Sequence, residues 1–249
     1  MTGLADIVPT LVAVAILMAL TVTVLAIVRA PHRRAPALAI LRGTAQLAAI
    51  SLVLSSVITS ALWVSVALLV MFTVAAVTAS RRLTWTWAHF GLVAGAMASG
   101  VLATLAIVFL TGAISFTPRY ALAIGGIVIG NAMTIATLSG RRITDSIHER
   151  WEEIEGWLAL GATPRQSTIR LARTAVYSAL IPVTDQTRTT GLVTLPGAFV
   201  GAIFGGVSPL EAGAFQITVL ASVMAAGSIT SALVVRGLAP VSVRPAALR

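Results

Sequence analysis

Long apolar segments constrain this chain more than any other feature of its sequence. A helix needs about 20 apolar residues to cross a hydrocarbon core ~30 Å thick, and seven segments come close to that length. The expected fold class is therefore all-α, a polytopic bundle of about seven transmembrane helices. The segments cover approximately residues 7–28, 37–57, 61–79, 88–111, 120–138, 182–206 and 212–235.

The charged residues support a membrane protein and predict its orientation. Charged residues make up 10% of the 249 residues, whereas they form about a quarter of an ordinary soluble domain. The net charge of +9 comes from arginines between the apolar segments, so we do not expect a nucleic-acid partner. Arginine-rich loops alternate with arginine-poor loops. By the positive-inside rule, this predicts an outside N-terminus and a cytoplasmic C-terminus in a multi-pass protein of the cell (plasma or inner) membrane.

The longest polar interruption, at about 140–180, is expected to be a cytosolic loop containing two short helices joined at a tight corner. Gly161 fits the position after the first helix, because glycine adopts left-handed backbone without a Cβ penalty. Thr163, Pro164 and Gln166 fit the N-cap, first and third positions of a capping box. Two apolar stripes are expected to be buried: Ile143, Ile147, Ile154 and Leu158 before the corner, and Ile169, Ala172, Val176 and Leu180 after it.

The corner resembles a motif of membrane transporters. Glu155, Gly156 and Trp157, then three residues and Gly161, look like a degenerate form of the E-A-A-x-x-x-G loop of ABC-importer permeases, which docks into a cleft on the ATPase. Gly156 and Trp157 stand where that motif has alanines. The resemblance implies an ATPase-coupling loop formed by Glu152, Glu155, Gly156, Leu158, Ala159, Gly161, Ala162 and Thr163.

A wider series of motifs is more specific. The sequence G-N-A-M at 130–133 precedes the corner, and D-Q-T-R-T-T-G-L-V-T-L-P-G at 185–197 and F-G-G-V-S-P-L-E-A at 204–212 follow it. Together they resemble the bacterial iron-export permease family (FetB type), which also contains the plant aluminium-sensitivity permease.

This resemblance implies the permease subunit of an ABC transporter that works as a homodimer in the lipid bilayer. Residues 1–240 would form one transmembrane permease domain and 241–249 a short flexible tail. A separate cytosolic ATPase subunit would hold ATP and Mg, and the cargo would be exported iron or a related metal. The plant members of this family suggest an organic cargo such as a nucleotide sugar as the alternative.

Several polar and small residues are candidates for the transport pathway, each with a purely structural alternative. Amide, hydroxyl and thioether groups on the fifth segment could meet a metal ion or could hydrogen-bond between helices. Asp185 and Arg188, three residues apart at the expected cytoplasmic end of the sixth segment, could form an interfacial ion pair or a charged inner mouth. Pro182 and Pro196 each predict a kink or break. The candidate pathway residues are Asn131, Met133, Thr134, Asp185, Gln186, Thr190, Thr194, Pro196 and Gly197.

Small residues also recur every fourth position at Gly197, Gly201 and Gly205. Such a face allows close helix approach, either inside the bundle or at a dimer seam. The same spacing occurs at Gly91, Gly95 and Ser99, and at Gly126 and Gly130.

Missing motifs narrow the function. The chain has no G-x-x-x-x-G-K-[ST] sequence, so we expect no nucleotide cofactor on it, and it has no His-based metal motif or nucleophile motif. We therefore expect no catalytic residues and no enzyme activity. No Asp or Glu is expected midway through a span, which disfavours a proton-coupled transporter. A secondary transporter or channel without an ATPase, and a membrane scaffold, remain the alternatives.

Overall fold

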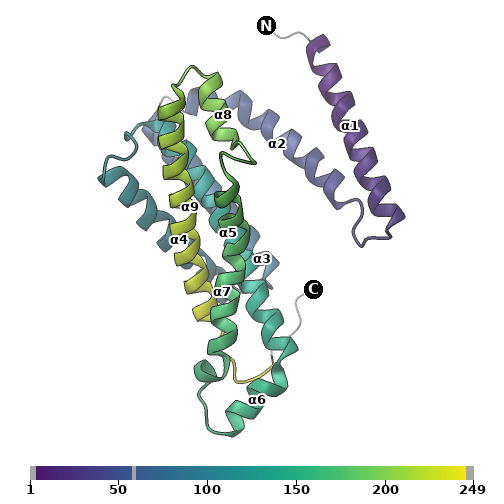
Figure 1. Ribbon diagram of the computed structural model, residues 1–249, viewed down its shortest axis with the longest axis vertical. Coiled ribbons are helices and arrows are strands. Elements are labelled where there is room, and N and C mark those ends of the chain that lie inside the picture. Colours follow the sequence, from purple (N-terminus) through teal and green to yellow (C-terminus); the bar gives the residue numbers. More distant parts are fainter. Residues whose placement is uncertain (1–3, 58–59, 245–249) are drawn as a thin grey trace. The chain divides into compact units, whose positions relative to one another are not determined.

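The computed structural model describes residues 4–57 and 60–244. In those residues the regular secondary structure is helical, apart from an isolated bridge between Thr190 and Thr194, which confirms the expected all-α class (Figure 1). The described helices are α1 (Leu4–Ile27), α2 (Ala35–Val57), α3 (Ala61–Arg82), α4 (Trp87–Leu110), α5 (Pro118–Glu149), α6 (Trp151–Ala159), α7 (Pro164–Thr189), α8 (Gly197–Phe204) and α9 (Pro209–Leu238).

Among the described residues, six helices are long and apolar enough to cross a membrane: α1, α2, α3, α4, α5 and α9. They correspond to six of the seven predicted segments. The remaining segment, 182–206, is not one continuous helix, which corrects its assignment as a single helical span: it holds the end of α7, an irregular stretch and the short helix α8. The break predicted at Pro196 is confirmed, because Pro196 is the N-cap of α8. The total number of spans and the orientation of the termini stay predictions.

The helix break that the sequence predicts at Pro182 does not occur at that residue. Pro182 lies inside α7, which continues for 26 residues although proline removes one backbone donor. Helix α7 packs against both α5 and α9, and this tertiary packing holds the helix together. The chain leaves helical geometry at Thr190 instead, and Pro196 is the N-cap of α8.

Three helices begin with the same N-capping arrangement. Thr117, Thr163 and Ser208 each have extended backbone, and each side chain accepts a hydrogen bond from the backbone N–H three residues later. A proline follows each of them at the first helical position, where its fixed φ suits the helix and its missing N–H costs nothing. The starts of α5, α7 and α9 are therefore fixed by local sequence.

The chain divides into two compact units, Met1–Val57 and Ile58–Arg249. In the N-terminal unit, α1 and α2 contact each other, and Arg29 and His32 in the turn between them have positive φ. Both helices expose large apolar side chains such as Leu11 and Leu41, as expected of helices that face lipid. Among the tail residues, 245–249 lie outside the described part of the chain.

Helix α9 is the centre of the C-terminal unit and packs against α4, α5, α7 and α8, while α3 packs against α4 and α5. Close approach depends on glycine. A Cβ on Gly100 would lie 2.5 Å from the backbone oxygen of Ala226, and one on Gly227 would lie 2.3 Å from Ile135. Neither glycine belongs to the four-residue series that the sequence singled out. In that series, Gly91, Gly95 and Gly130 have open space at the Cβ position.

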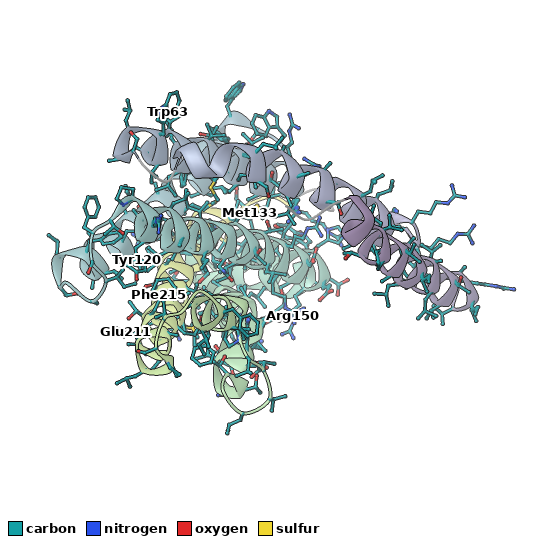
Figure 2. The ribbon with its side chains drawn as sticks, turned by 90° about the horizontal axis from the view of Figure 1, so that it is seen from above. Trp63, Tyr120, Met133, Arg150, Glu211 and Phe215 are labelled. Carbon is teal, nitrogen blue, oxygen red and sulfur yellow. The ribbon has the colours of Figure 1, made fainter. Side chains whose placement is uncertain are left out.

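The C-terminal unit has an arginine-rich end, defined by Arg81, Arg82, Arg141, Arg142 and Arg236. The Arg141 side chain donates to the backbone oxygen of Arg82 at 3.4 Å, so the ends of α3 and α5 meet there. At the opposite end Tyr120 and Phe215 pack with ring centroids 5.6 Å apart, near Glu211 (Figure 2). Arg119 lies next to Tyr120 at this opposite end, so the arginines are concentrated at one end but not confined to it, and this excess is what the positive-inside rule expects of the cytoplasmic face.

Candidate functional site

The corner between α6 and α7 has the local geometry that the sequence predicts. Gly161 has a φ of +89°. Its N–H donates to the oxygen of Leu158, and the N–H of Ala162 donates to the oxygen of Trp157, both at 3.0 Å. These two bonds form a Schellman motif. Thr163 and Gln166 then form the capping box, with the Thr163 N–H donating to the Gln166 side-chain oxygen at 2.8 Å.

One side of the corner is buried against the rest of the unit. Ile143 and Ile147 on α5 and Ile154 on α6 join Leu171 and Ala175 on α7 in a small apolar cluster, which also includes Val235 and Ala239 at the end of α9. The first predicted stripe is thus confirmed. The second is confirmed only in part: Ala172 and Val176 pack half-buried against the cluster, but Leu171, Ala175 and Ala179 are the buried residues and Ile169 is 50% exposed. The helix after the corner is also long, not short.

The other side of the corner presents an apolar surface, the corner patch, formed by Trp157, Leu160 and Ile169. Trp157 is 52% exposed and Leu160 is 83% exposed. All three residues line one groove between α6 and α7, together with Gly161 and Gln166. Large apolar side chains at the arginine-rich end, beyond the bundle core, indicate a protein contact surface.

The acidic residues of α6 divide between two roles. Glu153 forms an ion pair with Arg170 of α7 at 2.7 Å and a longer one with Arg150 at 3.7 Å, so it ties α6 to α7. Glu152 and Glu155 are exposed on α6, and among the described residues neither forms an ion pair. They are available to cations on a partner surface.

Alanine substitutions at two glycines of the corner should change the free energy of unfolding in opposite directions. Gly161 has left-handed backbone, so we expect Gly161→Ala to lower the free energy of unfolding by roughly 1 kcal/mol. Gly156 lies within α6 with open space at its Cβ position, so we expect Gly156→Ala to raise it by roughly 0.5–1 kcal/mol. Thermal unfolding of the purified protein in detergent checks both. Equal shifts for the two variants would contradict the corner geometry.

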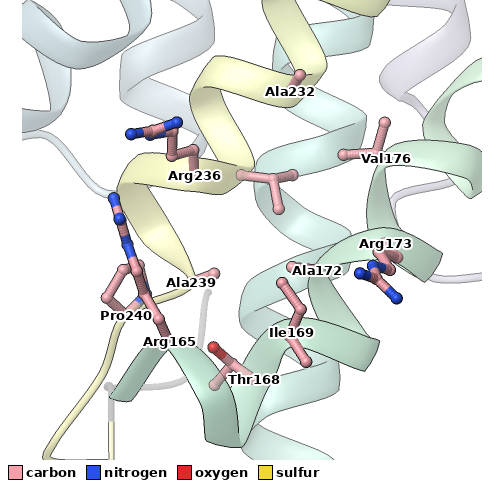
Figure 3. Close-up of a pocket in the computed structure, with 11 residues that line it drawn as sticks. Arg165, Thr168, Ile169, Ala172, Arg173, Val176, Ala232, Arg236, Ala239 and Pro240 are labelled. Atoms are coloured by element: carbon pink, nitrogen blue, oxygen red, sulfur yellow. The ribbon is translucent and has the colours of Figure 1, made fainter. Parts of the chain in front are cut away.

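A basic groove lies beside the corner between α7 and α9. Arg165, Arg173 and Arg236 line it, with Val176 and Ala232 further along the two helices (Figure 3). Figure 3 shows Arg165 and Arg236 on the same side of the groove. These arginines mark the level of the cytoplasmic headgroups that the charge pattern predicts.

The candidate residues on α5 bond within their own helix. The Asn131 amide donates to the oxygen of Ile127 at 2.9 Å, and the Thr134 hydroxyl donates to that of Gly130 at 3.2 Å. Met133 packs on the apolar core. Within the part of the chain that the structure describes, no group of three or more His, Cys, Asp or Glu side chains could hold a metal ion. The pathway role of these residues stays a prediction.

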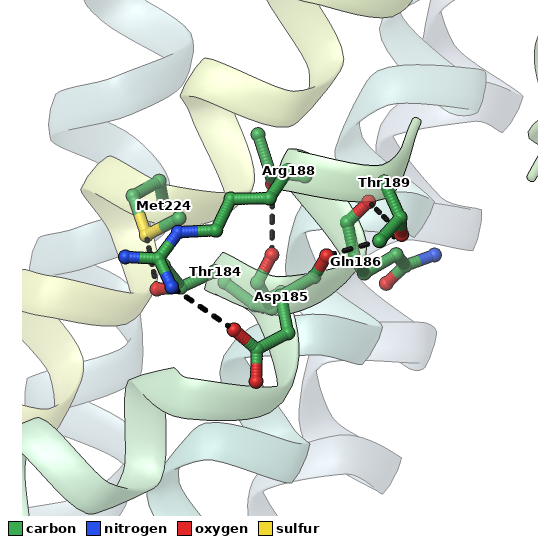
Figure 4. Close-up of polar contacts among 8 residues, drawn as sticks. Thr184, Asp185, Gln186, Arg188, Thr189 and Met224 are labelled. Carbon is green, nitrogen blue, oxygen red and sulfur yellow. Dashed lines mark hydrogen bonds and ion pairs between the residues drawn. The ribbon is translucent and has the colours of Figure 1, made fainter. Parts of the chain in front are cut away.

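The candidates at the end of α7 form one polar cluster (Figure 4). Arg188 and Asp185 form an ion pair at 3.3 Å, and the Thr190 hydroxyl donates to the oxygen of Gln186 at 2.8 Å. The Thr184 hydroxyl donates to the sulfur of Met224 at 3.8 Å, halfway along α9. The ion pair therefore lies opposite the middle of a membrane-length helix. This corrects its predicted place at the cytoplasmic end of a span.

The remaining candidates form the connection from α7 to α8. The Gly191 N–H donates to the Thr194 oxygen at 2.8 Å, and Pro196 and Gly197 start α8. A Cβ on Gly197 or Gly201 would meet nothing within 4 Å, while one on Gly205 would meet only neighbouring backbone of its own helix. The close helix contact predicted for this glycine face inside the bundle is therefore not found among the described residues.

Sequence reasoning missed Trp157, Leu160 and Ile169 as site residues. The signal was present for the first two, because they are large apolar residues in the most polar stretch of the chain. Ile169 was assigned to the buried stripe, and only the rotation of α7 reveals its exposure.

Comparison with known proteins places the chain in a family of membrane proteins. The chain is 39% identical over 197 residues to the UPF0014 membrane protein STAR2 of Oryza sativa subsp. japonica, covering 78% of this chain and 69% of that protein. It is 37% identical over 169 residues to the protein ALUMINUM SENSITIVE 3 of Arabidopsis thaliana, covering 68% and 62%.

One bacterial relative is named as a transport protein. The chain is 36% identical over 136 residues to the probable iron export permease protein FetB of Escherichia coli (strain K12), covering 55% of this chain and 52% of that protein. No solved structure matches the chain. The model of the Uncharacterised protein family (UPF0014) matches residues 8–240. The chain therefore belongs to this family of multi-pass membrane proteins, which includes a named permease.

Proposed function

We propose that this chain is the permease subunit of an ABC transporter that exports iron or a related metal ion. It works as a homodimer with a separate cytosolic ATPase, which binds ATP and Mg. The corner between α6 and α7 is the dock for that ATPase. The chain itself hydrolyses no nucleotide.

The observation that carries this proposal is the two-sided corner. On its inner side, Ile147, Ile154 and Leu171 pack the corner against the ends of α5, α7 and α9. Its outer side presents Trp157 and Leu160. A protein that pushes on the corner patch therefore moves three long helices of the bundle together, because the cluster beneath is close-packed. This is the mechanical connection that ATP-driven transport requires.

The cargo part of the proposal rests on the relative named as a probable iron export permease. The residues at the polar cluster are compatible with a hydrophilic cargo, because they supply carboxylate, amide and hydroxyl oxygens. An organic cargo such as a nucleotide sugar is the second candidate. A secondary transporter or channel is the third, and the ion pair opposite the middle of α9 keeps it open, since intramembrane carboxylates serve proton-coupled transport.

The test is reconstitution of the chain with and without its ATPase. The tagged chain is purified from native membranes, the co-purifying ATPase is identified by mass spectrometry, and both are placed in liposomes with a metal-sensitive dye. We expect Fe²⁺ movement only with ATP and both subunits. Flux from the chain alone without nucleotide would overturn the ATPase assignment. ATP-dependent movement of a nucleotide sugar but not of metal would overturn the cargo.

A further inference from the structure

The polar face of α7, defined as Asp185, Gln186, Arg188 and Thr189, lies opposite the middle of α9, which is long and apolar enough to cross a membrane. Helix α9 gives the depth. It has no charged residue between Glu211 and Arg236, and Met224 lies 13 and 12 residues from these two, or about 20 and 18 Å at 1.5 Å per residue. Thr184, next to Asp185, donates to the Met224 sulfur.

Helix α7 gives the same depth independently. Arg173 and Arg236 both line the basic groove at the arginine-rich end. Asp185 is 12 residues further along the continuous helix α7, or about 18 Å, and half of a ~30 Å hydrocarbon core is about 15 Å. The Asp185–Arg188 pair is therefore at mid-depth.

Within the described residues of the C-terminal unit, no other helix covers this polar face. The side chains of Asp185 and Arg188 are 59% and 73% exposed. Thr184 and Thr187 point to α9, where Thr187 lines a groove with Ile217 and Met224. Asp185 and Thr189 are on the opposite side of α7, by the 100° step between residues. Charged side chains at mid-depth do not face hydrocarbon and instead face protein or a water-filled cavity.

The charges favour a second copy of this chain as the covering element. The N-terminal unit is the alternative, but residues 7–57 contain no acidic residue and would bring Arg42, so it would add positive charge beside the Asp185–Arg188 pair without a compensating carboxylate. Two copies related by a two-fold axis normal to the membrane place two α7 helices at equal depth. Asp185 of each copy then lies one turn from the level of Arg188 of the other, and the four charges balance.

We propose that two copies of this chain face each other through the polar face of α7 and enclose a hydrated passage at mid-depth. Each copy supplies one wall, so the passage is incomplete in a single chain. Its lining of two carboxylates, two guanidiniums, and amide and hydroxyl groups suits a small hydrophilic ion. This inference takes its cargo class from the proposed function, while its geometry does not depend on it.

The test uses the absence of cysteine from the chain, so a single substitution gives a unique thiol. Gln186→Cys reports on the polar face. Leu102→Cys on α4 is the matched control, because Leu102 is 66% exposed and follows Gly100, which abuts Ala226 of α9 at a similar depth. Both full-length variants are labelled in native membrane vesicles with a charged, membrane-impermeant methanethiosulfonate, and then treated with a short bifunctional thiol reagent.

We expect Gln186→Cys to react at least about tenfold faster than Leu102→Cys, because thiolate formation requires water, and to give a covalent dimer that the control does not give. Equal rates would overturn the hydrated passage. Rapid labelling without a dimer would overturn the second copy. A cross-link from Gln186→Cys to Gln46→Cys within one chain would assign the cover to α2. A dimer that forms in membranes where no ATPase co-purifies would retain the passage and reject the ABC assignment.

Discussion

Asp185→Asn is expected to reduce transport at least about tenfold, equivalent to ~1.4 kcal/mol, without removing the protein from the membrane. The substitution leaves the Arg188 guanidinium, 3.3 Å away, without its counter-charge in the proposed passage. An uncompensated guanidinium in the passage would repel a metal cation, which is the physical reason for the expected loss of transport. Metal efflux from loaded vesicles measures the effect, and immunoblotting of the membrane fraction measures the amount of protein.

The double variant Asp185→Asn/Arg188→Gln tests the pairing itself. It removes both charges, so we expect it to recover part of the activity that Asp185→Asn loses. Asp145→Asn is the control for the chemical change, because Asp145 is exposed on the extension of α5 beyond the predicted span. A double variant that loses more than either single variant would show that the two charges act separately. Wild-type efflux from Asp185→Asn would contradict the mid-depth position.

The sequence predicted best where structure is decided by a few adjacent residues. The Gly161 turn and the Thr163–Gln166 capping box are confirmed because glycine conformation and side-chain capping depend on local backbone alone. The six long helices are confirmed as helices for a similar reason, since an apolar run of about 20 residues is itself a sufficient signal.

The sequence predicted the bounds of α7 and the depth of its residues least well. Hydropathy started a span at Pro182, but the helix begins at Pro164 and passes through that proline. The amphipathic first half of α7 was predicted to be a short helix within a cytosolic loop, so Asp185 was placed at the membrane surface. Only contacts between distant residues, such as Thr184 with Met224, reveal that an Asp lies opposite the middle of another helix.

Close packing of glycine was a second feature that sequence spacing did not determine. Gly100 and Gly227 allow backbones or side chains to approach, yet they lie outside the regular four-residue series. A Cβ on Gly197 or Gly201 of α8, which belong to that series, would meet nothing within 4 Å. Spacing identifies a smooth helix face, whereas the partner of that face depends on the whole bundle.

Trp157→Ala and Leu160→Ala are expected to weaken ATPase binding more than any other change at the corner. Both side chains are exposed, at 52% and 83%, so neither substitution creates a cavity in the cluster around Ile154. A buried aromatic anchor at a protein interface contributes about 2 kcal/mol or more, and we therefore expect binding of the ATPase to be at least roughly 30-fold weaker for Trp157→Ala. Binding of the purified ATPase to the permease in nanodiscs gives the dissociation constants.

Trp63→Ala provides the matched control. Trp63 is 57% exposed, close to the value for Trp157, but it lies in the first turn of α3, whereas Arg81 and Arg82 at the other end of that helix belong to the arginine-rich end. The same loss of an exposed indole should leave ATPase affinity unchanged there. Equal losses for Trp63→Ala and Trp157→Ala would indicate a general effect on the bundle. Unchanged affinity for Trp157→Ala and Leu160→Ala together would mean that the ATPase, if one binds, docks elsewhere than on the corner patch.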